Sequence, residues 1–200
     1  SPLTGNLCLI TEFMKDCIEH KDSIYENFTD DHLTQAIRGL ATLHSLYWNN
    51  TSEKMKKIMG IEDSTLLLFD SIMSFSWSPS TRKVMFQSWQ YTNHFQTILH
   101  GDARIGNMMF ANNGKGRFVF FDWQAVRKGR AVYDLAYFLI LSLSNEHRQK
   151  AEQQCLQQYY RFLLQGGVTD YSFQQLENDY KHATLCLLAL LSLPLLSGEA

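Results

Sequence analysis

The stretch that decides the fold of this chain is LHGDARIGNMMFANNGKGRFVFFD, residues 99–122. Two short apolar runs, at 107–110 and 118–121, lie on either side of an Asn113-Gly114 step. Both residues of such a step tolerate positive φ, and the pair is a strong signal for the tight turn of a β-hairpin. We therefore predict a hairpin whose two strands are these two runs.

Polar side chains gather at the open end of this hairpin. Asn107 lies seven residues before Gly114 and Asp122 eight residues after it, so pairing of the strands makes them neighbours. Asp102 lies five residues before Asn107, on the loop that feeds the first strand. The sequence thus predicts that two carboxylates and one amide converge within a few ångströms.

These residue types suit phosphoryl transfer. Carboxylate and amide oxygens are ligands for Mg²⁺, which takes the rest of its shell from water and phosphate oxygens. A separate carboxylate nearby accepts the proton of an attacking hydroxyl. The Asp-x-x-x-x-Asn spacing from Asp102 to Asn107, with Asp122 ending the next strand, matches the catalytic loop and the metal-binding Asp of protein kinases. Each residue alone has a structural explanation, but their combination with the hairpin favours a catalytic site.

The rest of the chain is predicted to be mainly helical. One apolar stripe at helical spacing consists of Leu33, Ile37, Leu40, Ala41, His44 and Trp48. Residues 29–31 supply cap candidates before it, with acidic groups that suit the positive end of the helix dipole. Further helices are expected at 84–98, 131–144 and 146–164, and a short strand at 7–14.

Local signals mark the ends of the later helices. Gly166-Gly167 ends the helix at 146–164, and Ser172 with Gln175 forms a capping box for the last helix. Lys54, Lys56 and Lys57 are interpreted as a solvated helix face, with anion binding as the alternative.

Composition excludes several classes of protein. The chain has 200 residues, with 18 Lys and Arg against 20 Asp and Glu and a formal net charge of −2. This length fits one domain or a large part of one, and the near-neutral charge argues against a nucleic-acid partner. The four cysteines have no CxxC spacing, so we expect reduced thiols and a cytoplasmic location rather than disulfides or zinc. The most apolar stretch, 183–196, contains Pro194 and falls short of the roughly 20 residues of a membrane span, so it is predicted to be a buried helix.

The histidines are given structural roles, and the aromatic residues have two interpretations. His100 is expected to be buried and to hold the loop through hydrogen bonds, whereas the other histidines show no metal-binding spacing and are assigned to surface or core. Aromatic side chains either line an apolar pocket for a phosphate acceptor or belong to the core; these are Trp48, Trp77, Trp89, Tyr91 and Tyr159.

Four motifs carry a resemblance to a known family. They are LHGDARIGN at 99–107, FFDWQ at 120–124, YDLAYFL at 133–139 and LATLH at 40–44. In combination they resemble the aminoglycoside phosphotransferase and choline kinase superfamily, and most closely its ecdysteroid-kinase-like, or CHK-kinase-like, branch. The implied fold is α+β and mainly α: the C-terminal lobe of a protein-kinase-like enzyme, helical with a small β-hairpin that carries the site. Residues 1–14 would be the end of the N-terminal lobe and the hinge strand, and residues 15–200 the C-terminal lobe.

The resemblance also implies roles for site residues. Asp102 corresponds to the catalytic base, and Asn107 and Asp122 to the Mg²⁺ ligands. His100 and Asp134 correspond to supports of the catalytic loop.

Two other segments take their roles from the same resemblance. Glu12, Phe13 and Met14 match the hinge, whose backbone groups bind the adenine of ATP. Arg104 stands where this branch usually has Trp, so it is a candidate contact to phosphate or substrate, and Trp123 stands where Phe is commoner.

The implied activity is ATP- and Mg²⁺-dependent transfer of a phosphate to a hydroxyl group. The partners would be ATP and a small-molecule acceptor, which in the insect branch is a steroid, with no nucleic acid or membrane involved. Because six residues precede the hinge strand, the N-terminal lobe is expected to be absent, which would leave the isolated lobe weakly active or inactive. A truncated, non-catalytic binding module is the alternative, and a hydrolase that uses the same residues on water is a third. Oligomeric state stays open.

Overall fold

The computed structural model describes residues 14, 16–19, 28–58, 80, 96–112 and 116–197, with side chains up to residue 188 and excluding that of residue 56. The strands are β1 (Cys17–Glu19), β2 (Thr97–Leu99), β3 (Met108–Ala111), β4 (Val119–Phe120) and β5 (Arg127–Gly129). The helices are α1 (Asp30–Leu46), α2 (Glu53–Lys56), α5 (Val132–Ser142), α6 (Asn145–Gln165) and α7 (Phe173–Ser197), with 3₁₀ turns at Ile105–Asn107 and Trp123–Ala125. The predicted class, mainly helical with small sheets, is confirmed.

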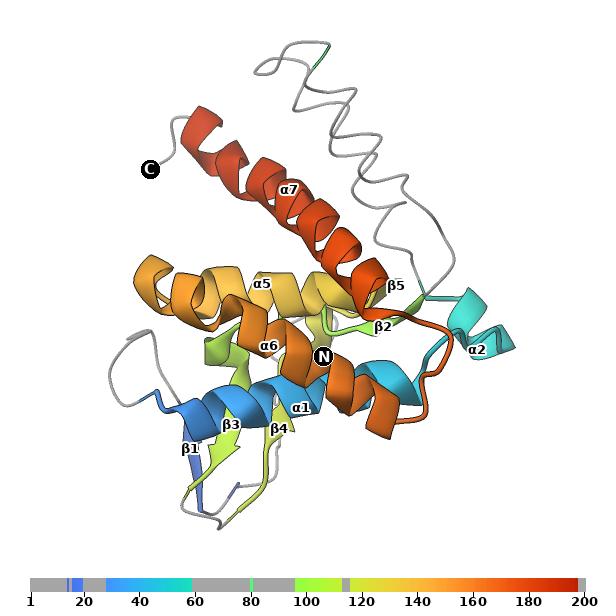
Figure 1. Ribbon diagram of the computed structural model, residues 1–200, viewed down its shortest axis with the longest axis horizontal. Coiled ribbons are helices and arrows are strands. Elements are labelled where there is room, and N and C mark those ends of the chain that lie inside the picture. Colours follow the sequence, from blue (N-terminus) through green and yellow to red (C-terminus); the bar gives the residue numbers. More distant parts are fainter. Residues whose placement is uncertain are drawn as a thin grey trace, which may run out of the picture.

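Two small antiparallel sheets meet a group of helices. Helix α1 packs along α6, and α5 packs against α7 (Figure 1). One sheet has the strand order β1-β3-β4, and the other pairs β2 with β5. Strand β3 also packs on α1, so the hairpin is fixed to the helical part of the molecule.

The predicted hairpin is confirmed, and its strands pair antiparallel. Met108 pairs with Phe120 and Met109 with Val119. The N–H of Phe121 then donates to the carbonyl of Asn107 at 3.1 Å, which extends the ladder by one step toward the open end. The turn itself, at 113–115, lies outside the described residues.

Helix α1 begins at the cap that its sequence predicts, and its apolar stripe is buried. Thr29 is the N-cap, and its hydroxyl accepts from the N–H of His32 while the His32 ring accepts from the N–H of Thr29. The stripe is buried from Leu33 through His44. Trp48, which we placed on the same stripe, lies beyond the helix end and donates instead to Asp170 at 2.9 Å.

The predicted helix ends further along are confirmed. Helix α6 stops at Gln165, directly before Gly166. The N–H of Ser172 donates to the side chain of Gln175, whose own N–H donates to the Ser172 hydroxyl, which is the expected capping box.

One sequence prediction needs correction, and a second lies almost entirely outside the described residues. The helix expected at 84–98 is wrong at its end, because Thr97 and Ile98 belong to β2 and pair with β5; its other described residue, 96, is not helical either. The strand expected at 7–14 falls outside the described residues except for Met14, which is not in a strand. The first described strand starts at Cys17, because pairing with β3 fixes it there. Sequence-distant pairing of this kind leaves no local signal.

The lysine-rich segment fits its interpretation, whereas the apolar C-terminal segment is helical as predicted but only partly buried among its described side chains. Lys54 and Lys57 are exposed on and beside the short helix α2. In α7, Ala183 and Leu187 are buried, whereas Leu188 is 57% exposed. Within the part of the chain that the structure describes, we find no helix of the length and apolarity that crossing a bilayer takes.

Candidate functional site

The loop at 100–107 is shaped by one glycine and by its own backbone. Gly101 has φ +83°, and a Cβ there would collide with the carbonyl oxygen of Ala125. The N–H of Arg104 donates to the carbonyl of Asp102, and that of Asn107 to the carbonyl of Arg104, both at 2.9 Å. The tight turns bring the Asp102 and Asn107 side chains to the same side.

Asp134 ties this loop to helix α5. Its carboxylate is fully buried and accepts the N–H of His100 at 2.6 Å and the N–H of Gly101 at 3.0 Å. The Nε2 of His44 lies 3.3 Å from the same carboxylate, and its Nδ1 lies 2.6 Å from the Tyr159 hydroxyl. The contacts are those that a brace of the loop requires.

His44 is a residue that the sequence analysis missed. We assigned it to surface or core without a role, and the structure buries it completely between Asp134 and Tyr159. A polar ring in an apolar helical stripe was the available signal, because a buried polar group needs a partner. Burial raises the pKa of Tyr159 well above its ordinary value, so its hydroxyl stays protonated and is able to donate.

His100 joins the loop to the end of the hairpin. Its side chain is buried, as predicted, and Nε2 lies 2.9 Å from the carbonyl of Phe121, while Nδ1 accepts the N–H of Asp102 at 3.4 Å. These two contacts assign the N–H to Nε2 and the acceptor role to Nδ1. The ring also packs on Phe120 and Trp123, at 5.4 and 4.8 Å between centroids.

Asp102 and Asn107 are in direct contact. The amide nitrogen of Asn107 donates to the Asp102 carboxylate at 2.8 Å and to its backbone carbonyl at 2.9 Å. These bonds turn the amide oxygen of Asn107 away from Asp102. The Nε of Arg104 lies 3.5 Å from the other carboxylate oxygen, so a cation stands beside the proposed base.

Tyr137 is a second residue that the sequence analysis missed as part of the site. Burial, and after it the charge of the nearby Asp102 carboxylate, raises the pKa of Tyr137 to about 12. Its ring stacks on Tyr133 at 6.3 Å. The motif YDLAYFL contains both tyrosines, but 35 residues separate Tyr137 from Asp102, and no local pattern links them.

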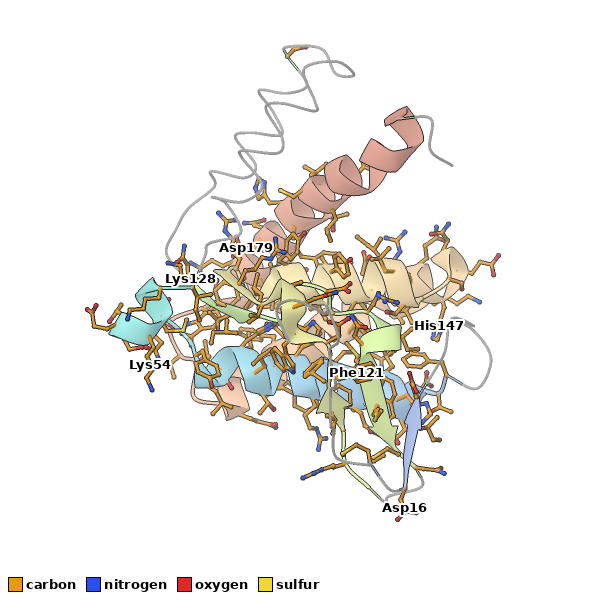
Figure 2. All side chains as sticks on the ribbon, turned by 180° about the vertical axis from the view of Figure 1, so that it is seen from behind. Asp16, Lys54, Phe121, Lys128, His147 and Asp179 are labelled. Atoms are coloured by element: carbon orange, nitrogen blue, oxygen red, sulfur yellow. The ribbon has the colours of Figure 1, made fainter. Side chains whose placement is uncertain are left out.

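Asp122 follows directly on the end of the hairpin. Its backbone is left-handed, at φ +59° and ψ +63°, and its carboxylate is exposed, with Gln124 donating to it at 3.4 Å. Figure 2 shows Phe121 at the open end of the hairpin and Asp16 near its opposite end. Asn107 directly precedes β3 and Asp122 lies two residues after β4, so both flank the open end of the paired strands.

The donors at this end of the hairpin fit a magnesium ion in their chemistry. They are the carboxylate of Asp122 and the amide oxygen of Asn107, hard oxygen ligands of the kind that leave positions for water and phosphate. In the described residues we find no group of three or more His, Cys, Asp and Glu side chains placed to hold a metal. The expected pair is not such a group, because it consists of one carboxylate and one amide.

The remaining predicted residues are either outside the described part of the chain or have other contacts. Glu12 and Phe13 are outside the described residues, as are Trp77, Trp89 and Tyr91. The sulfur of Met14 lies 3.9 Å from the guanidinium of Arg117, toward the turn end of the hairpin. Tyr159 is fully buried with its hydroxyl against His44, and Trp48 packs on Tyr171 and donates to Asp170. A hollow of about 600 Å³ between α1 and residues 116–123 is lined by none of the predicted site residues.

Two comparisons of the sequence point to kinase-like proteins. The model of a family described as the ecdysteroid kinase-like family matches residues 9–167. An uncharacterized kinase-like protein of Caenorhabditis elegans is 35% identical over 86 residues, which cover 42% of this chain and 23% of that protein.

Two solved structures share the fold. A putative aminoglycoside phosphotransferase from Ralstonia eutropha JMP134 aligns with a TM-score of 0.58 and 13% identity, over 90% of this chain and 62% of its own. A macrolide 2′-phosphotransferase type I aligns with a TM-score of 0.59 and 14% identity, over 94% of this chain and 63% of its own. The chain therefore spans less than two thirds of the length of each of these proteins.

Proposed function

Because the chain belongs to the ecdysteroid kinase-like family, we propose that it carries the catalytic residues of an enzyme that phosphorylates a hydroxyl of a small molecule with ATP. The contact between Asp102 and Asn107 carries the proposal. This contact supports a site in which the proposed base lies beside a proposed metal ligand. Phosphoryl transfer to an alcohol needs such an arrangement.

Asp102 is proposed as the base that accepts the proton of the acceptor hydroxyl. Its side chain is 22% exposed, so a bound hydroxyl has access to it, while Asn107 holds one carboxylate oxygen in place. Proton acceptance by a positioned carboxylate typically contributes 10²–10⁴-fold to a rate. Asp134 and His100 support this position through the backbone of the loop.

Asn107 and Asp122 would hold Mg²⁺, which when bound neutralises charge on the phosphate oxygens. The Arg104 guanidinium is 43% exposed beside Asp102, and we propose that it contacts the phosphate or the acceptor.

The binding site for the nucleotide would be completed by other parts of the molecule. We propose that Glu12, Phe13 and Met14 form the hinge that binds adenine, and that residues 15–200 form the lobe beneath it. The remaining third of the relatives' length would then supply the other side of the ATP cleft. A cytoplasmic location is proposed because the reaction draws on ATP.

The test is turnover of ATP by the full-length protein, wild type against Asp102→Asn. An aminoglycoside, a macrolide and an ecdysteroid serve as hydroxyl-bearing probes, with water as the reference acceptor. We expect ADP release to fall by about 10²-fold or more in Asp102→Asn. The exposed Asp31→Asn, on α1, is the matched control and should keep the wild-type rate.

Equal turnover by wild type and Asp102→Asn would remove the assignment of the base. Calorimetry with Mg·ATP separates the alternative function. Binding of the nucleotide without turnover of any probe would favour a non-catalytic binding module.

A further inference from the structure

Helix α5 contains two polar side chains that are not aromatic, Asp134 in its first turn and Ser142 at its end. Both are fully buried, and both accept hydrogen bonds from the backbone of the 100–107 loop. Asp134 braces the start of the loop, whereas the Oγ of Ser142 accepts the N–H of Ile105 at 2.9 Å. A buried hydroxyl in an apolar helix needs a partner, and this one bonds to the loop that carries the proposed base.

The Ile105 N–H stands at the start of a helical turn. Ile105 opens the 3₁₀ turn Ile105–Asn107, and the first N–H groups of a helix have no partner within that helix. Arg104, at the N-cap, makes no side-chain hydrogen bond to the turn. Ser142 therefore takes the place of a capping side chain, from a position 37 residues further along the chain. Since Ile105 is only 4% exposed, water is a poor substitute for this acceptor.

Asp102 lies between the two points at which α5 holds the loop. Gly101 directly precedes Asp102 and donates its N–H to Asp134. Ile105 follows three residues after Asp102. The two acceptors on α5 are eight residues apart, which is about 12 Å along a helix axis. A single helix thus fixes the backbone on both sides of the proposed base.

The 3₁₀ turn also places Asn107. The N–H of Asn107 closes the turn on the carbonyl of Arg104 at 2.9 Å, and its side-chain amide donates to the Asp102 carboxylate at 2.8 Å. Without the bond at Ile105, the turn would keep these internal contacts but lose its fixed position on α5. The pair of side chains would then be less well placed relative to Asp122 and the acceptor.

We propose that Ser142 is a positioning residue, which fixes the 3₁₀ turn and through it the placement of Asp102 and Asn107. This inference rests on the proposed function, in which Asp102 is the base and Asn107 a ligand of Mg²⁺. Ser142 itself is fully buried and touches neither ATP nor the acceptor in this proposal. Its loss therefore lowers the rate of the chemical step more than it weakens the binding of nucleotide.

The experiment replaces Ser142 by Ala, which removes the acceptor oxygen and introduces the best helix former. ADP release from Mg·ATP is measured in the full-length protein, with water as acceptor. We expect kcat to fall about tenfold, because small misplacements of reacting groups have large effects on rate. The KM for Mg·ATP should stay within about threefold of the wild-type value, since Asp122 and the proposed hinge lie outside the loop.

Thr184→Val is the matched control. The Thr184 hydroxyl donates to the carbonyl of Tyr180 at 2.9 Å within α7, so this substitution removes a helix hydrogen bond that does not involve the loop. We expect its kcat to stay within about twofold of wild type. An equal loss of kcat in Thr184→Val and Ser142→Ala would show that activity follows stability alone, and would overturn the inference.

Hydrogen exchange tests the contact without reference to activity. In protein labelled with ¹⁵N-isoleucine and followed by NMR, the wild-type Ile105 amide should exchange at least about 100-fold more slowly than in a free peptide. Ser142→Ala should raise its exchange rate about tenfold and leave that of Ile37, buried in α1, unchanged. An Ile105 rate that does not change in Ser142→Ala would overturn the inference. So would an unprotected Ile105 amide in the wild type, a measurement that does not depend on folding of the variant.

Asp102→Asn separates this inference from the proposed function. Loss of activity in Asp102→Asn with full kcat in Ser142→Ala would overturn the inference and leave the proposed function standing. Full activity in Asp102→Asn would instead overturn the proposed function, and the positioning role with it. In the double variant, Ser142→Ala should lower the residual rate of Asp102→Asn by less than it lowers the wild-type rate. A full tenfold loss on top of Asp102→Asn would show that Ser142 acts independently of the base, and would overturn the inference.

Discussion

Among single residues, Asp134 shows how hydrogen bonds stabilise a buried carboxylate. A buried charge is costly unless hydrogen bonds satisfy it. Here two backbone N–H groups of the loop and the ring of His44 surround the carboxylate. The same bonds fix the backbone of the loop one residue before Asp102, so stability and positioning have the same source.

Asp134→Asn should therefore destabilise the protein. The amide keeps one acceptor oxygen and places an NH₂ group against donors that have no other acceptor at that position. We expect the free energy of unfolding to fall by about 3 kcal/mol. Urea denaturation followed by circular dichroism measures it, with Asp31→Asn as an exposed control that stays within about 0.5 kcal/mol of wild type. A loss below 1 kcal/mol in Asp134→Asn would contradict the bracing role.

Sequence separation decides which residues of the site were predictable. Asp102 and Asn107 are five residues apart and are in contact, as their spacing predicted. Asn107 and Asp122 are related by one local turn, which predicted that they flank the same end of the hairpin. His44 lies 90 residues from Asp134, and Tyr137 lies 35 residues from Asp102. Both placements depend on how helices pack, which periodicity within one helix does not encode.

At the scale of elements, the hairpin and α1 are joined through a close approach at Gly39. A Cβ at this position would overlap the ring of Phe118. That ring already packs edge-on against Phe110 and Phe120, at 5.4 and 4.8 Å between centroids. Gly39 is therefore retained in a helix interior although glycine is a poor helix former there.

The substitution Gly39→Ala distinguishes helix propensity from packing, because the two effects change the free energy of unfolding in opposite directions. Helix propensity alone would stabilise the protein by about 0.5–1 kcal/mol. Displacement of a packed aromatic ring costs about 1–3 kcal/mol, so we expect net destabilisation in a urea titration. In a Phe118→Ala background the obstacle is gone, and the same substitution should become neutral or stabilising. Stabilisation by Gly39→Ala in the wild-type background would show that the approach is not close.

The helices and strands fall into the same two groups. Some have sequence signals within a few residues, and others depend on pairing with distant residues. Caps, glycine stops and the hairpin turn act within a few residues, and they placed α1, α6, the start of α7 and the β3–β4 pair. The strands β1, β2 and β5 are three residues long and pair with partners far along the chain. Pairing, and not propensity, makes them strands, which is why residues 97–98 were taken as the end of a helix.

For the whole molecule, the described part is held together by a core that reaches from the sheet to α6. Phe110 of β3, Phe138 of α5 and Tyr159 of α6 are all fully buried. Cys155 lies in α6, 2% exposed, on the same buried side. Burial is the main cause that raises the pKa of its thiol to about 12, with the charges of Glu152 and Asp30 adding to it.

The reactivity of Cys155 should therefore report the opening of the whole fold. The thiolate is the reactive form, and a pKa near 12 in place of about 9 lowers its population about a thousandfold at pH 8. The unfolded thiol loses its proton near pH 9 while the folded one keeps it to about 12, so this group lowers stability as pH rises through that window.

Alkylation at pH 8, with the labelled peptides quantified by mass spectrometry, measures this protection. Cys17, half-buried on the edge strand β1, is the internal reference and should react at least about a hundred times faster. The difference should disappear in urea, because unfolding gives both thiols the same surroundings. Equal rates for the two cysteines in native buffer would mean that α6 opens without the rest of the molecule. Since α6 carries Tyr159, such opening would also release His44 from one side and loosen the support of the loop.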